Sequence, residues 1–226
     1  MNSDSYLLSR QFMSLGGRSI VLLDASQQPD LGTILDVVSD DILNIAPSFS
    51  VESRQREWLL SRMLMRSLIG YIPGIGVFGE PVWYGAVSGS LSHKLGHIAF
   101  AFGASNQNHS YGIDLESCRD LDPGVVFKIM NRHEQLRLDE GIVGASSVVF
   151  SAKESIYKYL FNAVQKRFYF EAVELIDFQI AGDCGIMMFR TAIDLSRAVR
   201  AGRLLRIDFI KINLGGEDFW LTSARG

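Results

Sequence analysis

Cysteine is scarce in this chain, and positive charge is not in excess. Only two cysteines occur among 226 residues, and neither belongs to a paired Cys/His pattern that would hold zinc. Two cysteines are also too few for the disulfide framework of a small secreted domain. The formal net charge is −3, so the chain lacks the overall basic field of nucleic-acid-binding proteins. Any anion site must therefore be local.

Long hydrophobic runs and the pattern of a signal peptide are missing as well. The first ten residues carry Asp4 and scattered serines where a signal peptide needs a basic start and an apolar stretch. Apolar segments such as residues 98–102 are far shorter than the roughly 20 residues that span a bilayer. We therefore expect a cytoplasmic protein without a transmembrane segment.

Several common catalytic motifs are absent too. The sequence has no glycine-rich loop ending in Lys-Ser/Thr, no Gly-x-Gly-x-x-Gly, no Gly-x-Ser-x-Gly and no His-Glu-x-x-His. Its composition, 47% hydrophobic and 21% charged, is nevertheless that of a packed globular protein. Phosphate chemistry by the usual nucleotide-binding loops is therefore disfavoured.

Hydrophobic spacing predicts an α+β protein in which antiparallel sheet predominates. The clearest helix spans residues 52–69, with Ser50 as its expected N-cap and Gly70 as its stop. The other predicted helices are 125–138 and 148–163, and the predicted strands are 97–103, 111–116, 168–180, 204–214 and 219–222.

A small, polar segment at residues 103–110 divides the chain into two predicted lobes. We place the boundary so that residues 1–103 form an N-terminal lobe and residues 104–226 a C-terminal lobe. The last strand of the second lobe could pack back on the first.

The helix at 52–69 carries a basic stripe beside its apolar one. Arg54, Arg62 and Arg66 fall within about 120° of arc, at roughly 100° per residue. No acidic residue is expected beside them, so the stripe is either a phosphate site or a solvated helix face. The hydroxyl-rich turn at 89–94 ends in His93 and Lys94 and is a second candidate for phosphate. A lone histidine is, however, more often structural.

An acidic pair lies on the predicted strand at 111–116. Asp114 and Glu116 point to one face because side chains alternate along a strand. Two carboxylates at such a short separation repel each other unless a cation compensates their negative charge. Mg²⁺ prefers oxygen ligands of this kind. A solvated strand face is the other interpretation, and it is the commoner one for an isolated pair.

Glu154 is flanked by Lys153 and Lys158 on the predicted helix at 148–163. A carboxylate between two ammonium groups could serve metal and phosphate together. Alternatively, Ser151-x-x-Glu154 is a helix capping box, and Glu154 forms an ordinary surface ion pair with Lys158.

The order and spacing of these motifs resemble the 4′-phosphopantetheinyl transferase family, of the type that activates surfactin and enterobactin synthetases. The resemblance covers the middle half of the chain, and its last two segments are the most specific. The matching segments are residues 54–62, 81–83, 89–94, 112–116 and 150–158.

This resemblance implies a fold of two pseudo-symmetric α+β lobes, each a small, mostly antiparallel sheet packed with helices. The active site would lie in the cleft between them. The implied metal ligands are Asp114, Glu116 and Glu154, which with Lys158 form the catalytic group, and the implied coenzyme A contacts are Arg54, Arg62, Ser92, His93, Lys153 and Lys158.

The implied reaction is Mg²⁺-dependent transfer of 4′-phosphopantetheine from coenzyme A to a serine of an acyl or peptidyl carrier protein, releasing 3′,5′-ADP. Siderophore, non-ribosomal peptide or polyketide synthesis would be served. The resemblance also favours a monomer, matches Glu134 to a further family acid, and puts the carrier against residues 119–144. Glu80 stands where some relatives carry a lysine facing the nucleotide.

Two alternatives remain open at this point. A metal-dependent hydrolase of coenzyme A or another nucleotide pyrophosphate would use the same acids. A non-catalytic module that binds carrier proteins would keep the fold without turnover. The identity of the carrier is not encoded in any of these motifs.

Overall fold

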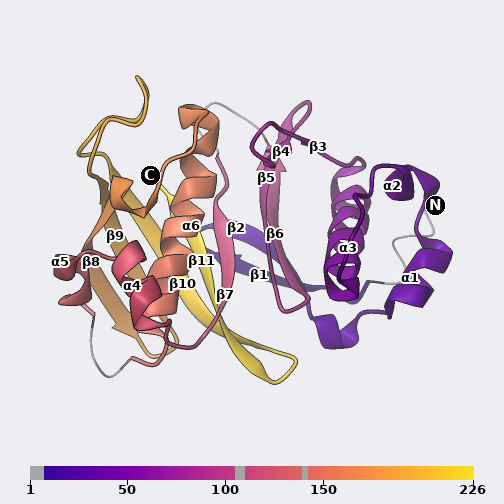
Figure 1. Cartoon of the computed structure of the whole chain (residues 1–226), viewed down its shortest axis with the longest axis horizontal. Coiled ribbons are helices and arrows are strands. Elements are labelled where there is room, and N and C mark those ends of the chain that lie inside the picture. The colour runs from indigo at the N-terminus through magenta and orange to yellow at the C-terminus, as the bar shows by residue number, and fades with distance from the viewer. Residues whose placement is uncertain (1–7, 105–109, 139–141) are drawn as a thin grey trace.

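Two antiparallel sheets lie at the centre of the protein (Figure 1). The computed structural model describes residues 8–104, 110–138 and 142–226. One sheet has the strand order β1-β2-β6-β5 and the other β7-β11-β10-β9-β8, and β3 pairs with β4 in a separate hairpin. The α+β class expected from the sequence is confirmed, with a sheet and helices in each half of the chain.

The strands and helices have the following bounds. The strands are β1 (Gln11–Leu15), β2 (Arg18–Leu23), β3 (Gly74–Ile75), β4 (Pro81–Val82), β5 (Val87–Lys94), β6 (His97–Ala104), β7 (Ile113–Ser117), β8 (Val173–Ala181), β9 (Cys184–Thr191), β10 (Leu204–Leu214) and β11 (Glu217–Arg225). The helices are α1 (Leu31–Val37), α2 (Asp40–Asn44), α3 (Glu52–Ile69), α4 (Pro123–Ile129), α5 (Arg132–Gln135) and α6 (Ala145–Val164).

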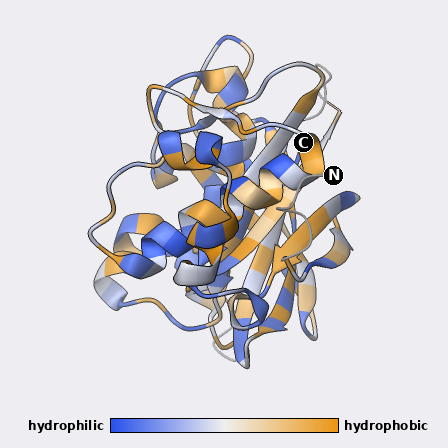
Figure 2. Ribbon diagram, turned by 90° about the vertical axis from the view of Figure 1, so that its right-hand side faces the viewer, coloured by the Kyte–Doolittle hydropathy of each residue, from blue (hydrophilic) through white to orange (hydrophobic). Residues whose placement is uncertain are grey.

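The core has three layers of apolar contact. Helix α3 packs on the first sheet, with residues such as Leu60 and Leu64 against Phe100. Helix α6 packs on the second sheet, and a third cluster joins the two sheets face to face through residues such as Ile20 and Phe219. Alternation of hydrophobic and hydrophilic residues is visible along several strands in Figure 2. In the part of the chain that the structure describes, no helix has both the length and the apolar character needed to cross a membrane.

The edges of the two sheets meet at β5 and β7, where serine side chains take the place of a strand ladder. Ser90 Oγ accepts a hydrogen bond from the Ile113 amide at 3.0 Å, and Ser92 Oγ accepts one from the Leu115 amide at 3.1 Å. Both hydroxyls are buried because alternate residues of β5 face β7. This junction fixes the position of β7 and of Asp114 beside it.

Most of the long elements match the sequence predictions. Helix α3 has the predicted bounds and ends at Gly70 with φ of 83°, although its N-cap is Val51 and not Ser50. Strand β6 begins at His97 as expected, and β10 matches the predicted 204–214.

Other elements differ from the predictions. The predicted helix 125–138 is split into α4 and α5, because Met130 is extended and Asn131 caps a new helix. Helix α6 begins at Ala145, so Ser151 is inside the helix and the capping-box interpretation of Ser151 and Glu154 is wrong.

Some strands differ in length from the predicted ones, and others were not predicted. The predicted strand 168–180 begins only at Val173, after a 3₁₀ turn, and the last strand, β11, is longer than the predicted 219–222. Residues 89–94, expected as a turn, belong to β5. The strands β1, β2 and β9 were not predicted.

The lobe boundary stays a prediction, since residues 105–109 of the expected seam lie outside the described residues. The turn between β10 and β11 does reach the first half of the chain. The Gly215 amide donates to Oδ2 of Asp24 at 2.9 Å, and Phe219 lies against the His97 ring with centroids 5.0 Å apart.

Candidate active site

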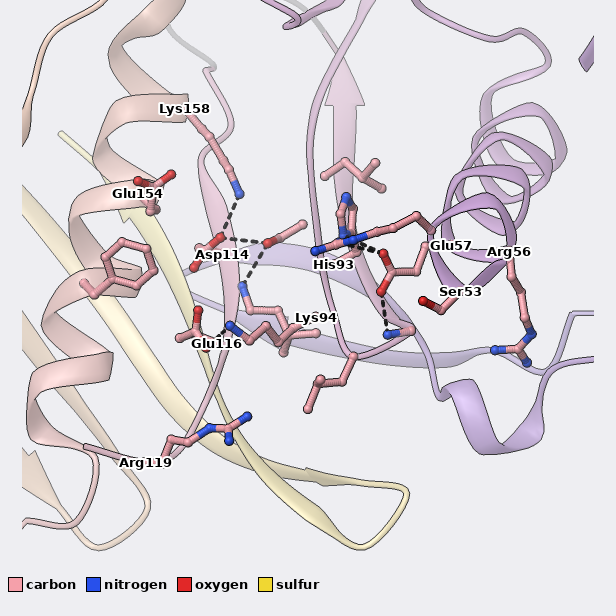
Figure 3. A pocket seen from close by; sticks show the side chains of 17 residues that line it. Ser53, Arg56, Glu57, His93, Lys94, Asp114, Glu116, Arg119, Glu154 and Lys158 are labelled. Carbon is pink, nitrogen blue, oxygen red and sulfur yellow. Dashed lines mark hydrogen bonds and ion pairs between the residues drawn. The ribbon is translucent and has the colours of Figure 1, made fainter. Parts of the chain in front are cut away.

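A cavity of about 880 Å³ opens between the two halves of the chain (Figure 3). Helix α3 and strand β5 line it from the first half, and strand β7 and helix α6 line it from the second. Its wall includes ten charged or ionisable residues: Arg54, Arg56, Glu57, His93, Lys94, Asp114, Glu116, Arg119, Glu154 and Lys158.

Strand β7 supplies two carboxylates to this cavity. Asp114 and Glu116 are only 6% and 7% exposed, so they do not form a solvated strand face. Oδ1 of Asp114 accepts from Ser92 Oγ at 2.7 Å and from Lys158 Nζ at 2.8 Å. Oε1 of Glu116 accepts from the Ser117 amide at 2.8 Å and pairs with Lys94 Nζ at 2.5 Å. The second oxygen of each carboxylate, Oδ2 and Oε2, receives no hydrogen bond from the described residues.

Helix α6 contributes Glu154 and Lys158, one turn apart, from the side opposite α3 (Figure 3). Unlike the two acids of β7, Glu154 has no hydrogen-bond partner among the described residues. Burial raises the pKa of its carboxyl, and the negative charge of Asp114 raises that pKa further. An unpaired carboxylate near two others is suited to bind a cation or to accept a proton.

His93 lies on the wall formed by the first half of the chain. Its Nδ1 is 3.3 Å from Oε2 of Glu57, a buried side chain of α3. Burial lowers the pKa of His93, and Glu57 opposes that shift. Glu57 also accepts from the Gly96 amide at 2.7 Å and from Arg54 at 2.9 Å, so one carboxylate positions both His93 and Arg54 beside the cavity.

A second cavity of about 350 Å³ adjoins the first, and His93, Glu154 and Lys158 line both. Arg62 lies in its wall with its guanidinium 4.5 Å from the centre of the Trp58 ring. Burial lowers the pKa of Arg62 to about 10, which leaves it charged at neutral pH.

The basic stripe of α3 is not free of acidic partners, contrary to the sequence interpretation. Arg54 pairs with Glu57, and Arg66 pairs with Asp41 of α2. Among the described residues, the guanidinium of Arg62 contacts Ser61 and Trp58 of the same helix and no carboxylate.

Lys153 was predicted as a site residue, but its ammonium lies in the core of the second half and not at the two joined cavities. Its side chain is 1% exposed, and its ammonium donates to Ile129 O at 2.8 Å, to Phe170 O at 3.1 Å and to Glu134. Glu134 also caps α5 and accepts from the Leu175 amide at 2.8 Å. The expected contact of Lys153 with the pyrophosphate of coenzyme A is therefore not supported by this geometry, and Glu134 is its buried partner.

The remaining predicted residues gather around the two joined cavities. Arg54, Ser92, His93, Asp114, Glu116, Glu154 and Lys158 line the first, and Arg62 lines the second. The sequence analysis missed Glu57 and Arg119. Glu57 follows Arg54 by three residues on α3, which is the spacing of an intrahelical ion pair and could have been recognised.

Comparison with known proteins gives two matches. A family model described as the 4′-phosphopantetheinyl transferase superfamily matches residues 110–199. The 4′-phosphopantetheinyl transferase Npt of Nocardia iowensis is 32% identical over 117 residues, which cover 48% of this chain and 53% of that protein. The chain thus spans about half the length of this curated relative.

Both matches are to 4′-phosphopantetheinyl transferases, and the family model covers residues 110–199 of this chain. The part matched by the family model contains Asp114, Glu116, Glu154 and Lys158. Arg54, Arg62, Ser92 and His93 lie before it, and the structure brings some of these to the same cavity.

Asp114, Glu116 and Glu154 fit a hard divalent cation by the chemistry of their donors. All three offer carboxylate oxygens, and the oxygens without hydrogen bonds are available for coordination. The described residues do not, however, hold three such groups close enough to form a ready-made metal cluster. Lys158 pairs with Asp114, and Lys94 pairs with Glu116.

Proposed function

We propose that this protein transfers 4′-phosphopantetheine from coenzyme A to a serine of an acyl or peptidyl carrier protein, with Mg²⁺ as cofactor, and releases 3′,5′-ADP. One observation carries the proposal. Three carboxylates of the second half, Asp114, Glu116 and Glu154, face His93 and Arg54 of the first half across one cavity. Such a site can accept a pyrophosphate and a divalent cation together.

The cations on the cavity walls fit the phosphates of coenzyme A, which is heavily anionic. Arg62 and His93 are suited to the phosphates of the adenosine end, and Arg54 adds charge at the outer rim. Lys158 lies at the junction of the two cavities, where we expect the pyrophosphate. The local positive charge is what the acidic chain as a whole lacks.

The proposed step is an in-line displacement at phosphorus. The carrier serine Oγ forms a bond to the phosphorus that bears pantetheine, and the bond from that phosphorus to the bridging oxygen breaks. Glu154, which has no hydrogen-bond partner among the described residues, accepts the serine proton, and its raised pKa suits a base that must work near neutral pH. Lys158 stabilises negative charge on the phosphoryl oxygens.

Asp114, Glu116 and Glu154 would hold the Mg²⁺, which when bound polarises the pyrophosphate and stabilises the leaving 3′,5′-ADP. Ser92 keeps Asp114 in place for this by donating to its Oδ1. The attacking hydroxyl belongs to the carrier, so the transferase needs no nucleophile of its own.

The carrier would approach from the side of α4 and α5. Several large apolar side chains are exposed there, including Phe127 at 73%, Leu136 at 75% and Val143 at 70%. They fall within the segment 119–144 expected to contact the carrier, of which residues 139–141 lie outside the described residues. We propose carriers of siderophore, non-ribosomal peptide or polyketide synthesis as the first to try.

Intact-mass spectrometry of an apo carrier protein tests the proposal. The carrier is incubated with this protein, coenzyme A and Mg²⁺, beside a sample with EDTA. We expect the carrier to gain the mass of one phosphopantetheine group and the gain to vanish with EDTA. Release of free phosphopantetheine without a mass gain would instead identify a hydrolase. Binding of several carriers without any turnover would identify a non-catalytic module.

A further inference from the structure

Lys94 occupies an unexpected position at the last residue of β5. Its ammonium lies 2.5 Å from Oε1 of Glu116, although it comes from the other sheet. The contact crosses the junction between the two halves, just before the tight turn at Leu95 and Gly96. Figure 3 shows Lys94 reaching Glu116 beneath Asp114.

The pairing places a positive charge where a metal ligand is expected. Asp114, Glu116 and Glu154 bring three negative charges to the cavity, and Lys158 and Lys94 bring two positive ones. A divalent cation added alone would leave an excess of positive charge. A divalent cation that arrives with the pyrophosphate of coenzyme A would not, because the phosphates compensate it.

We propose that Lys94 is a built-in counter-ion of Glu116 that weakens metal binding until coenzyme A is present. This inference rests on the proposed function, since it assumes that Glu116 is a metal ligand. Lys94 thereby couples the two ligands: the divalent cation binds tightly only as part of its complex with the coenzyme A pyrophosphate. Once displaced from Glu116, the ammonium is available to a phosphate oxygen.

Lys94 is better placed for this role than Lys158. The ammonium of Lys158 is also held by the Ile113 carbonyl at 3.1 Å, and Ser92 shares its carboxylate. The Lys94 ammonium contacts Glu116, and the Lys94 side chain is 34% exposed. The ammonium can therefore move away from Glu116 without breaking a buried network.

The affinity for Mn²⁺, measured by electron paramagnetic resonance in the absence of coenzyme A, tests the inference directly. Lys94→Gln removes the charge and should tighten Mn²⁺ binding up to about fivefold, the range expected for loss of a partly exposed ion pair. Lys94→Arg keeps the charge and should leave the affinity at the wild-type value. Lys211→Gln, which breaks the surface pair with Asp183, controls for the change in net charge.

Coenzyme A should reduce the difference between Lys94→Gln and wild type, because the phosphates then hold the metal in both proteins. Equal or weaker Mn²⁺ binding by Lys94→Gln, in a protein whose thermal midpoint matches wild type, would overturn the inference. A similar gain in Lys94→Arg or Lys211→Gln would overturn it too.

The carrier mass assay separates this inference from the proposed function. If Lys94→Gln tightens Mn²⁺ binding and Glu116→Gln abolishes that gain, the counter-ion role holds even where no carrier gains mass. If carriers gain mass but Lys94→Gln leaves Mn²⁺ affinity unchanged, the transferase function holds and the counter-ion role is wrong.

Discussion

Lys153 and Lys158 belong to the same helix, α6, yet their ammonium groups have different surroundings. Five residues at 100° each turn the two side chains about 140° apart around the axis. Lys153 therefore enters the core and pairs with Glu134, whereas Lys158 enters the cavity and pairs with Asp114. One lysine maintains the fold of the second half, and the other lies where a ligand in the cavity can reach it.

The same division occurs among other residues of one type. Arg62 lines a cavity while Arg66, one turn further along α3, pairs with Asp41. His93 lies beside the cavities while His97 accepts from the Ala25 amide at 3.0 Å in the core. Residue type alone does not identify a binding residue, because the partner and the degree of burial decide what the side chain does.

The largest expected effect comes from Glu154, the cavity acid that accepts no hydrogen bond from the described residues. Glu154→Gln should lower the rate of transfer about 10²-fold to 10⁴-fold, the usual contribution of a general base, while coenzyme A binding is retained. The measurement is the rate of carrier mass gain beside coenzyme A affinity by calorimetry. Glu174→Gln, which alters a surface pair with Arg190, is the matched control. Full activity of Glu154→Gln would remove this residue from the mechanism.

Breaking the buried ion pair of Lys153 and Glu134 tests the face of α6 that packs in the core. Lys153→Met leaves Glu134 unpaired in the core and should lower the free energy of unfolding by about 3 kcal/mol or more. Lys158→Met should change stability by less than about 1 kcal/mol, because its pair is partly exposed. Denaturant unfolding of both variants checks the comparison, and equal losses would contradict it.

Arg62 and Arg66 extend the comparison to α3. Arg62→Ala should raise KM for coenzyme A about tenfold with little change in kcat, because a contact remote from the reacting atoms contributes mainly to binding. Arg66→Ala should leave KM unchanged. Steady-state kinetics with varied coenzyme A gives both values, and the reverse pattern would reassign the phosphate contact.

The smallest effect concerns His97 and pH. Burial lowers the pKa of His97 in the folded protein. In the unfolded chain this histidine has its ordinary pKa of about 6.5, so below that pH the unfolded state binds the proton more readily than the folded state. The contribution of this residue to stability should therefore fall as the pH drops below about 6.5. His97→Gln should flatten that part of the curve, as followed by thermal midpoints from pH 5 to 8. An unchanged slope would assign the effect to other groups.

Much of the fold could be predicted wherever periodicity was strong. The Leu60 and Leu64 spacing defined α3, and the alternation along β7 placed Asp114 and Glu116 on one face. The hairpin of β1 and β2 was missed although a signal for it exists. Gly16 and Gly17, with φ of 59° and 74°, separate two strand-like runs, which is a common pattern of a two-residue turn.

The surroundings of each site residue were harder to predict. The partner of Lys153 is Glu134, 19 residues earlier in a helix of one turn. The partner of Glu116 is Lys94, on another sheet. Such pairs depend on how separate elements pack, and no local pattern in the sequence records them. Resemblance to a family supplied the identity of the acids but not the cation beside each one.

The serine junction between β5 and β7 gives the site a mechanical property. A continuous strand ladder would resist sliding of the two halves, but here Ser90 and Ser92 hold two backbone amides by their hydroxyls. Ser92 also donates to Asp114, so displacement of β5 along β7 would disturb the carboxylate through the same oxygen atom. The position of β5 is thus transmitted to Asp114 through a single hydroxyl group.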